Sequence, residues 1–332
     1  MNDLADRVLE VARAAGRRAA AVCRGVLAAS EGGGAMAKGD DSPVTVADFG
    51  SQAVILDGVR AAFPGHGVIA EEGAAQLRAG ASPESAALLV RLAGEALARP
   101  MSFEQVCDAI DHAGAPGAEY AWCIDPIDGT KGFLRREQYA VAIGVLREGM
   151  PWAGVLVCPN LPVDLKRADG PRGVMFVAAR GRGCTVEPLD GGAAWTARVT
   201  ASRDPAAWRV LGSVESAHGD PQLVNDVIAQ AGIGGGFVRY DSQVKYGVVA
   251  CGGAEIYLRP RSKPSYREHV WDHAAGVIVC EEAGGRVSDV DGKPLDFTRG
   301  SRLEDNRGIL ATSGGRVHEV VLEALRAVEA RV

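Results

Sequence analysis

The sequence lacks the features of a membrane-spanning protein and of a protein that binds polymeric nucleic acid. None of its 332 residues belongs to a run near the roughly 18 uninterrupted apolar residues of a membrane span. Its 36 basic and 42 acidic residues give a formal net charge of −6, and no basic run is long enough to form a nucleic-acid face. Any nucleotide that the chain binds is therefore expected to be small.

The seven cysteines form no CxxC pair, and the amino-terminal segment has no apolar signal core. A zinc knuckle or a redox pair is accordingly not expected. An odd number of scattered cysteines is typical of a reducing compartment. Asp3, Asp6 and Glu10 argue against a transit peptide in the first predicted helix. The sequence thus predicts a cytoplasmic protein.

The first half is predicted to contain helices packed on a mainly antiparallel sheet. Apolar residues recur at helical spacing from Leu4 to Val26, and a second helix is expected over 48–63. The Ala-rich segment 74–118 is predicted to be helical with indistinct boundaries. Strands are expected at 68–70, 120–124, 140–146, 152–157 and 173–178.

In the second half strands and helices alternate, which predicts an α/β layer. Strands are expected at 209–212, 237–240, 255–258, 286–290 and 308–312. Helices are expected at 221–231, 242–252, 271–283 and from 317 onward. The length favours two domains. A break at Pro159-Asn160-Leu161-Pro162 puts the predicted boundary near residue 160, with one domain over 1–160 and the other over 161–332.

The most informative segment is Asp125-Pro126-Ile127-Asp128-Gly129-Thr130. It places two carboxylates at the carboxyl end of a predicted strand, separated by a proline turn. Gly129 allows a ligand to come close to the backbone. Asp, Pro and Gly are also the residues of an ordinary polar turn, which would explain this segment taken alone.

Three further carboxylates stand at comparable positions. Glu71, next to Glu72, closes a short predicted strand, and Asp48 and Asp272 each open a predicted helix. The alternatives are a solvated strand end for Glu71 and helix N-capping for Asp48 and Asp272, which stabilises a helix by about 1 kcal/mol. Each alternative suffices for one residue, but their joint occurrence along the chain favours a shared site.

Together these segments resemble the lithium-sensitive, magnesium-dependent phosphomonoesterase superfamily, which includes inositol monophosphatase and fructose-1,6-bisphosphatase. The resemblance joins Glu71, the segment 125–130 and the run Trp271-Asp272-His273-Ala274-Ala275-Gly276 in order, and it covers nearly the whole chain. It implies an α+β or α/β fold, the layered αβαβα sandwich of the inositol monophosphatase type. One departure is Ala70, which stands where the superfamily usually has Gly before the first glutamate.

The resemblance implies two or three Mg²⁺ ions as cofactor. Glu71, Asp125 and the backbone carbonyl of Ile127 would hold one ion, and Asp125, Asp128 and Asp272 would hold a second. Oxygen ligands of this kind suit Mg²⁺. Four carboxylates in one pocket repel one another unless cations neutralise them.

The catalytic roles also come from the resemblance. Thr130 would pass the proton of an attacking water to Asp48, which makes Asp48 an orienting base. The water would attack phosphorus in line, with no covalent phosphoenzyme. None of the cysteines has a place in this scheme.

Flanking residues resemble one branch of the superfamily, the 3′(2′),5′-bisphosphate nucleotidases. The matching segments are 41–48, 128–134, 158–161, 241–246 and 266–276. The branch implies that Ser242, Lys245 and Arg259 bind a 5′-phosphate and that His218 lies against adenine, with Gly129 and Thr130 also contacting substrate. The alternatives are ordinary surface charges for Lys245 and Arg259 and an exposed loop histidine for His218.

The resemblance therefore predicts a Mg²⁺-dependent phosphomonoesterase that removes the 3′-phosphate of adenosine 3′,5′-bisphosphate. Its partner would be a small-molecule substrate, and the chain would be a monomer or homodimer. Inhibition by Li⁺ is expected. The alternatives are an inositol polyphosphate 1-phosphatase or inositol monophosphatase and, more remotely, a non-catalytic sensor of a nucleotide or metal.

Overall fold

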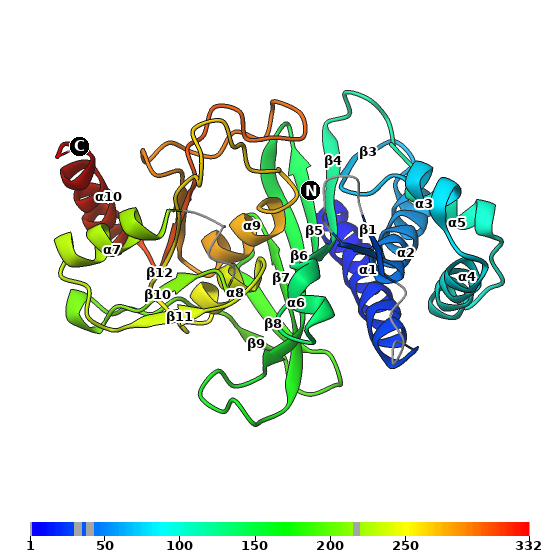
Figure 1. Ribbon diagram of the computed structural model, residues 1–332, viewed down its shortest axis with the longest axis horizontal. Helices are drawn as coiled ribbons and strands as arrows, with labels where there is room; N and C mark the ends of the chain where they lie inside the picture. The colour runs from blue at the N-terminus through cyan, green and yellow to red at the C-terminus, as the bar shows by residue number, and fades with distance from the viewer. Residues whose placement is uncertain (1, 30–34, 38–42, 215–219, 332) are drawn as a thin grey trace.

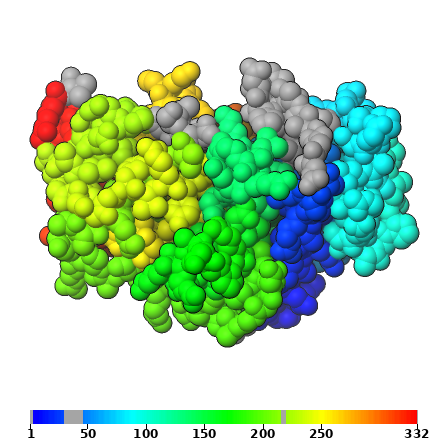
Figure 2. Space-filling view, turned by 60° about the horizontal axis from the view of Figure 1, so that its bottom comes forward, coloured from blue at the N-terminus to red at the C-terminus, as the bar shows by residue number. Residues whose placement is uncertain are grey.

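The computed structural model describes residues 2–29, 35–37, 43–214 and 220–331. Helices and sheets alternate in five layers (Figure 1), which confirms the predicted αβαβα sandwich. Three apolar clusters fill the spaces between successive layers. In the space-filling view, the green residues of the first sheet lie between the blue and cyan amino-terminal helices and the yellow second half (Figure 2).

The first layer consists of α1 (Asn2–Ala29) and α2 (Val46–Ala62), which pack against each other and against one face of the first sheet. A short antiparallel pair, β1 (Ala35–Ala37) and β2 (Pro43–Thr45), precedes α2. The sequence predicts one apolar face for α2. In the structure every α2 residue from Val46 to Leu56 is buried, so the polar side chains among them must find partners inside the protein.

The segment 74–118 forms the helices that were predicted for it, α3 (Ala74–Gly80), α4 (Pro83–Leu97) and α5 (Phe103–Ile110). Ser82 caps α4, and Ser102 and Gln105 form a capping box on α5. α4 and α5 pack on the outer side of α2, and this cover explains why α2 is buried on all sides from Val46 to Leu56.

The first sheet has seven strands in the order β3-β4-β5-β6-β7-β8-β9. Only β3 and β4 are parallel, so the sheet is mainly antiparallel, as predicted. The strands are β3 (Gly67–Ala70), β4 (Tyr120–Asp128), β5 (Ala140–Arg147), β6 (Met150–Pro162), β7 (Arg172–Ala179), β8 (Cys184–Pro188) and β9 (Trp195–Thr196).

The first sheet continues past residue 160, where the sequence predicts a domain boundary. β6 runs through that position, and β7, β8 and β9 extend the same sheet to Thr196. The chain enters the second sheet only at Val210. The division into two domains stays a prediction.

The second sheet has five strands in the order β11-β10-β12-β14-β13, with parallel pairing of β10 to β11 and β12. α8 (Val244–Ala250) and α9 (Ala274–Glu282) lie between the sheets, and α7 (Pro221–Gln230) and α10 (Gly315–Glu329) cover the outer face. The strands are β10 (Val210–Gly212), β11 (Phe237–Arg239), β12 (Ile256–Arg259), β13 (Arg286–Ser288) and β14 (Ile309–Thr312), and a 3₁₀ turn, η1 (Pro205–Ala207), precedes them.

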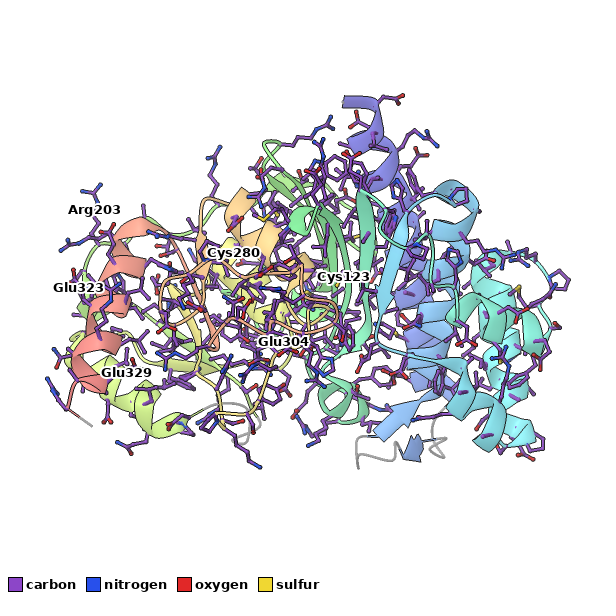
Figure 3. The ribbon with its side chains drawn as sticks, turned by 90° about the horizontal axis from the view of Figure 1, so that it is seen from above. Cys123, Arg203, Cys280, Glu304, Glu323 and Glu329 are labelled. Atoms are coloured by element: carbon purple, nitrogen blue, oxygen red, sulfur yellow. The ribbon has the colours of Figure 1, made fainter. Side chains whose placement is uncertain are left out.

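All seven cysteines are free thiols, and six of them are buried. They are spread over the layers: Figure 3 labels Cys123 on the first sheet and Cys280 on α9. Burial raises the pKa of both thiols, which keeps them protonated. Among the described residues no helix is long and apolar enough to cross a membrane.

A buried histidine joins three elements of the second sheet and its outer layer. His318 on α10 contacts the Ser288 hydroxyl through Nε2 at 2.8 Å and the Thr312 hydroxyl through Nδ1 at 3.0 Å. A neutral imidazole, which offers one donor and one acceptor, satisfies both contacts. Burial and the charge of Arg286 lower the pKa of His318 to about 4.

We expect His318 to make folding stability depend on pH between 6.5 and 4. Because the folded pKa lies below the unfolded one, the unfolded chain binds more protons in this window, and stability falls as the pH falls. The loss contributed by this group reaches up to about 3 kcal/mol. Urea unfolding from pH 7 to pH 4 should show a steeper loss in the wild type than in His318→Gln, and equal slopes would contradict this assignment.

Candidate active site

A cleft of about 660 Å³ opens between the carboxyl ends of β3 and β4 and the segments around α8 and residues 259–272. Eight of the predicted site residues line it: Glu71, Asp128, Gly129, Thr130, Ser242, Lys245, Arg259 and Asp272. Asp48, Asp125 and Ile127 are buried, and His218 lies outside the described residues. A second cavity, of about 420 Å³, contains none of the predicted site residues.

The two carboxylates of β4 are brought to the same side by a β-bulge. In the register with β5, Asp125 pairs with Ala142 and Asp128 with Ala140, so three steps along β4 match two along β5. Without the extra residue, side chains three positions apart would point to opposite faces of the sheet. The bulge lies at Pro126, which has no N–H to donate, and it returns Asp128 to the side of Asp125.

Glu71 reaches the same place because β3 runs parallel to β4. Ala70 pairs with Ile124, and the Glu71 amide donates to the Ile124 carbonyl at 3.2 Å. Parallel strands end at the same edge, so Glu71 lies beside the start of the Asp125 turn. Ala70 in place of glycine therefore fits an ordinary extended strand.

Helix α2 supplies a polar stripe under these carboxylates. Asp48, Ser51 and Gln52 stand three and four positions apart, which places them on one helix face, and all three are buried. The Ser51 hydroxyl donates to the Pro126 carbonyl at 2.9 Å. The Gln52 amide exchanges two hydrogen bonds with the backbone of Glu72, at 2.7 and 3.0 Å. Asp48 lies within the first turn of α2, which begins at Val46. The N-capping alternative therefore does not apply to Asp48.

Asp272 precedes α9 rather than opening it. The helix begins at Ala274 with His273 at the N-cap, so the N-capping alternative does not apply to Asp272. Gln243 fixes this turn: its side chain donates to the Trp271 carbonyl at 2.9 Å and accepts from the Gly276 amide at 3.0 Å. The Gln243 backbone amide donates to the Asp128 carboxylate at 2.6 Å. Gln243 therefore links Asp128 to the turn that carries Asp272.

The carboxylates of the site form an electrostatically strained group. Burial is the first cause that raises the pKa values of Asp125, Asp128 and Asp272, and repulsion adds to it, from Glu71 on Asp125 and from Asp128 on Asp272. Asp48 is close enough to raise the pKa of Asp125 as well. The Asp125 Oδ1 atom is buried and has no hydrogen-bond partner among the described residues.

A hard divalent cation fits this donor set. An unpartnered buried carboxylate oxygen is costly in a protein, and a cation would both coordinate it and relieve the repulsion. All candidate donors are carboxylate or carbonyl oxygens, the ligands that Mg²⁺ prefers. The Ile127 carbonyl accepts a hydrogen bond from the Thr130 hydroxyl at 3.3 Å, which leaves it a second lone pair.

The opposite wall of the cleft carries two cations, one on a buried lysine and one on a half-buried arginine. Lys245 is 2% exposed, and its ammonium donates to the Tyr240 carbonyl at 3.1 Å. Burial lowers the pKa of Lys245 to about 8, although Asp128 opposes this shift. Arg259 pairs with Glu268 at 2.9 Å. Neither residue is an ordinary surface charge.

The backbone between these cations and the carboxylates is specialised. Gly129 has φ +86°, and a Cβ there would lie 3.0 Å from the Cβ of Ser242. Ser242 itself has φ +64°, which is uncommon for a residue other than glycine. The absence of a side chain at Gly129 therefore allows the loop before α8 to lie against the start of α6 (Thr130–Leu134).

Several residues that shape the cleft escaped the sequence prediction. They are Ser51, Gln52, Asp241, Gln243, Tyr266 and Glu268. A signal existed for Ser51 and Gln52, because polar residues interrupt an otherwise apolar helix at the spacing of Asp48. The other four lie in connecting segments, within the stretches 241–246 and 266–276 that carry the resemblance, but the resemblance assigned them no role. Asp241, for example, accepts hydrogen bonds from Arg135 at 2.7 Å and the Val214 amide at 3.3 Å.

Residues 4–330 match the family described as the inositol monophosphatase family. A 3′(2′),5′-bisphosphate nucleotidase of Emericella nidulans is 38% identical over 320 residues, covering 87% of this chain and 89% of the relative. A protein of the same name from Oryza sativa is 38% identical, covering 92% and 90%. One from Schizosaccharomyces pombe is 35% identical, covering 90% and 88%.

Solved structures share the fold at lower identity. An inositol monophosphatase from Anabaena is 24% identical with a TM-score of 0.63, covering 98% of this chain and 96% of its own. An IMPase from Thermotoga maritima is 18% identical with a TM-score of 0.63, covering 100% and 99%. These two likenesses concern the layered architecture.

Proposed function

The chain belongs to the inositol monophosphatase family, and we propose that its cleft hydrolyses the 3′-phosphate of adenosine 3′,5′-bisphosphate to give AMP and phosphate. The chain is a phosphatase, since curated relatives that match it over about nine tenths of their length are named 3′(2′),5′-bisphosphate nucleotidase. The alternative of a non-catalytic sensor is therefore not favoured. The substrate assignment rests on one observation: a carboxylate cluster lies in the same cleft as buried Lys245 and half-buried Arg259.

Members of this family generally use Mg²⁺, and the carboxylate cluster fits that ion. Glu71, Asp125, Asp128, Asp272 and the Ile127 carbonyl would hold two or three ions. When bound, Mg²⁺ supplies positive charge that polarises a phosphate ester and acidifies water. The repulsion among these carboxylates would favour its binding.

The chain's own residues would orient the nucleophile and hold the substrate. Asp48 accepts the proton of the attacking water through the Thr130 hydroxyl, and its burial keeps it fixed on α2. Ser242, Lys245 and Arg259 bind the 5′-phosphate with one hydroxyl and two cations. Gly129 lets the ligand approach the backbone, and His218 contacts the base.

Phosphate release tests this proposal directly. Adenosine 3′,5′-bisphosphate, inositol 1,4-bisphosphate and inositol 1-phosphate would be compared at equal Mg²⁺, with millimolar Li⁺ as an expected inhibitor. We expect a clear preference for the nucleotide. A preference for either inositol phosphate would overturn the substrate assignment and leave the metal-ligand assignment intact.

The reducing cytoplasm is the proposed location, in keeping with seven free thiols. The chain is proposed to act as a monomer or homodimer.

We expect Lys245→Ala to raise KM for adenosine 3′,5′-bisphosphate by about tenfold or more, because a charge-assisted hydrogen bond to phosphate contributes about 1.5–3 kcal/mol. KM for adenosine 3′-monophosphate should change by less than about threefold, since this substrate lacks the 5′-phosphate. Steady-state kinetics on both substrates measure the difference. Lys293→Ala, an exposed lysine outside the cleft, is the control, and equal effects on both substrates would refute the 5′-phosphate assignment.

A further inference from the structure

Glu268 is a buried carboxylate for which the proposed mechanism has no use. It is 3% exposed, and its Oε2 atom lies 2.9 Å from Nη2 of Arg259. The same Nη2 reaches the Tyr266 hydroxyl at 3.4 Å. Arginine has five N–H donors in a rigid fork, so these contacts fix the guanidinium by one corner and leave donors on its other nitrogens for a ligand in the cleft.

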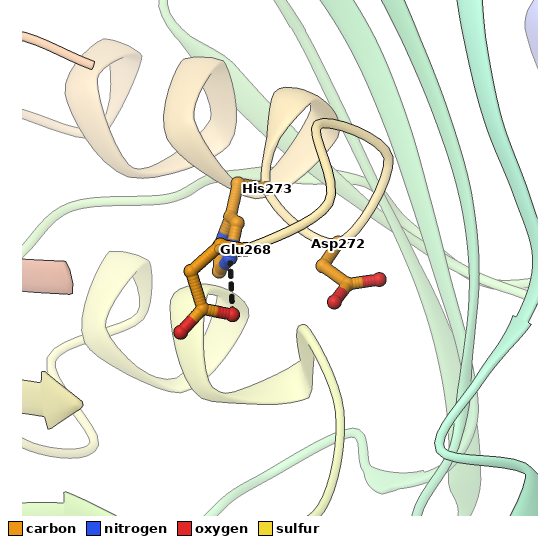
Figure 4. Close-up of side chains that lie close together, drawn as sticks. All are labelled: Glu268, Asp272 and His273. Atoms are coloured by element: carbon orange, nitrogen blue, oxygen red, sulfur yellow. Dashed lines mark hydrogen bonds and ion pairs between the residues drawn. The ribbon is translucent and has the colours of Figure 1, made fainter. Parts of the chain in front are cut away.

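The Glu268 carboxylate also contacts His273. His273 Nε2 lies 3.5 Å from Glu268 Oε2, and His273 Nδ1 lies 2.9 Å from the Tyr246 hydroxyl. Figure 4 shows the His273 ring against the Glu268 carboxylate. Asp272, the residue before His273, is drawn beside them. Tyr246 is wedged against α9, since a Cβ at Gly276 would lie 2.2 Å from its ring. The chain of contacts from Tyr246 to Arg259 therefore begins in the core.

The three ligand atoms of Glu268, Asp272 and His273 lie within 4.8 Å of one another, a spacing that would also suit a metal ion. Two contacts argue against that use of Glu268. The Arg259 cation already neutralises it at 2.9 Å, and the neighbouring imidazole is engaged by Tyr246. A second cation at Glu268 would be repelled by the guanidinium.

The charges of the pair agree with a positioning role. Burial acts most strongly against the charged form of Arg259, but Glu268 is the leading opposing group. Together with Tyr257, Tyr266 and Asp272 it raises the pKa of the guanidinium well above its usual range. Glu268 cancels much of the positive charge that would attract any anion. What remains at Arg259 is directional hydrogen bonding, which distinguishes a phosphate at one position from other anions.

We propose that Glu268 is a positioning residue that makes the cleft selective for substrates with a second phosphate, by holding Arg259 in the orientation that binds it. The inference rests on the proposed function and adds a specificity determinant to it. Glu268 does not line the cleft, whereas Arg259 does, so Glu268 acts through Arg259.

The test compares adenosine 3′,5′-bisphosphate with adenosine 3′-monophosphate, which differ only in the 5′-phosphate. We expect Glu268→Ala to lower the ratio of kcat/KM for the two substrates by about tenfold or more, chiefly through KM for the bisphosphate. Glu268→Gln keeps an acceptor for Arg259 and should retain the ratio within about threefold. The double variant Arg259→Ala/Glu268→Ala should be no less selective than Arg259→Ala alone, because Glu268 acts through the residue already removed.

Glu255→Ala is the matched control. Glu255 is 2% exposed and pairs with Arg209 at 3.4 Å, but this arginine, unlike Arg259, does not line the cleft. Its removal should lower the unfolding temperature and leave the ratio unchanged. If Glu268→Ala does not fold, Glu268→Asp replaces it, since the shorter side chain withdraws the carboxylate from Arg259.

The outcomes separate this proposal from the one on which it rests. If the wild type prefers the bisphosphate and Glu268→Ala keeps that preference, Glu268 does not set selectivity. An equal fall of kcat on both substrates also overturns the proposal, because it would place the effect at Asp272. If the wild type shows no preference for the bisphosphate, the proposed substrate fails and the role of Glu268 fails with it.

Discussion

Replacing Asp125 with asparagine is expected to lower kcat by at least about 10³-fold while making the metal-free protein more resistant to heat. The loss of activity follows because Asp125 is the carboxylate that both ion positions would share, and a factor of 10³ corresponds to about 4 kcal/mol. The gain in stability follows because its buried Oδ1 has no partner among the described residues and its charge is repelled by Glu71, Asp128, Asp272 and Asp48. Function and stability thus oppose each other at this residue.

The sign of the pH dependence is fixed by the direction of the pKa shift. The folded pKa of Asp125 is raised, so the folded chain holds more protons than the unfolded chain between the two pKa values. Without metal, stability therefore falls as the pH rises through this window. Asp125→Asn should flatten that fall, and calorimetry in EDTA between pH 4 and pH 8 measures it.

Asp289→Asn is the control for a buried aspartate with satisfied oxygens. Asp289 is fully buried and accepts hydrogen bonds from the amides of Asp291, Lys293 and Arg307 and from the Asn306 side chain. Its replacement should lower the unfolding temperature in EDTA, whereas Asp125→Asn should raise it by about 2 °C or more. A lower unfolding temperature for both variants, or activity of Asp125→Asn within tenfold of wild type, would contradict the assignment.

The layered fold was largely predictable because its elements carry their own periodicity. Helix α1 repeats apolar residues at helical spacing, and the strands of both sheets appear close to their expected ranges. The short β8 and β9 were not predicted. β9 has two residues, too few for an alternating pattern. A strand at 173–178 was predicted for the first half, but the predicted boundary near residue 160 cut it off from the sheet that it joins by pairing with β6.

The charged residues of the site were predictable because they stand in motifs that resemble those of a known family. The resemblance brought Glu71, Asp128, Asp272, Lys245 and Arg259 to one cleft, as the structure shows. Their supporting partners were not predictable in this way. Glutamine, serine and glutamate are common in loops and helices. Gln243 and Glu268 lie in segments that carry the resemblance, but only the three-dimensional contacts show what they do there.

Asp48→Asn is the second substitution with a large expected effect, and it differs from Asp125→Asn in sparing the metal. Asp48 is 1% exposed and belongs to the buried polar stripe of α2. The Asp48 carboxylate is close enough to raise the pKa of Asp125. The resemblance nevertheless gives Asp48 no place among the metal ligands. An orienting base contributes about 10²–10⁴-fold to a rate, so kcat should fall within that range.

The measurement that isolates this role pairs kcat with Mg²⁺ titration. For Asp48→Asn the Mg²⁺ affinity should stay within about threefold of wild type, because the amide keeps the shape of the carboxylate and the ligand set is unchanged. Asp57→Asn is the control on the same helix: Asp57 pairs with Arg99 at 2.5 Å, away from the cleft, and should leave kcat unaltered. An unchanged kcat in Asp48→Asn would remove Asp48 from the mechanism. A loss of Mg²⁺ affinity as large as the loss of kcat would make it a metal ligand instead, because a base that only orients water acts after the ions are bound.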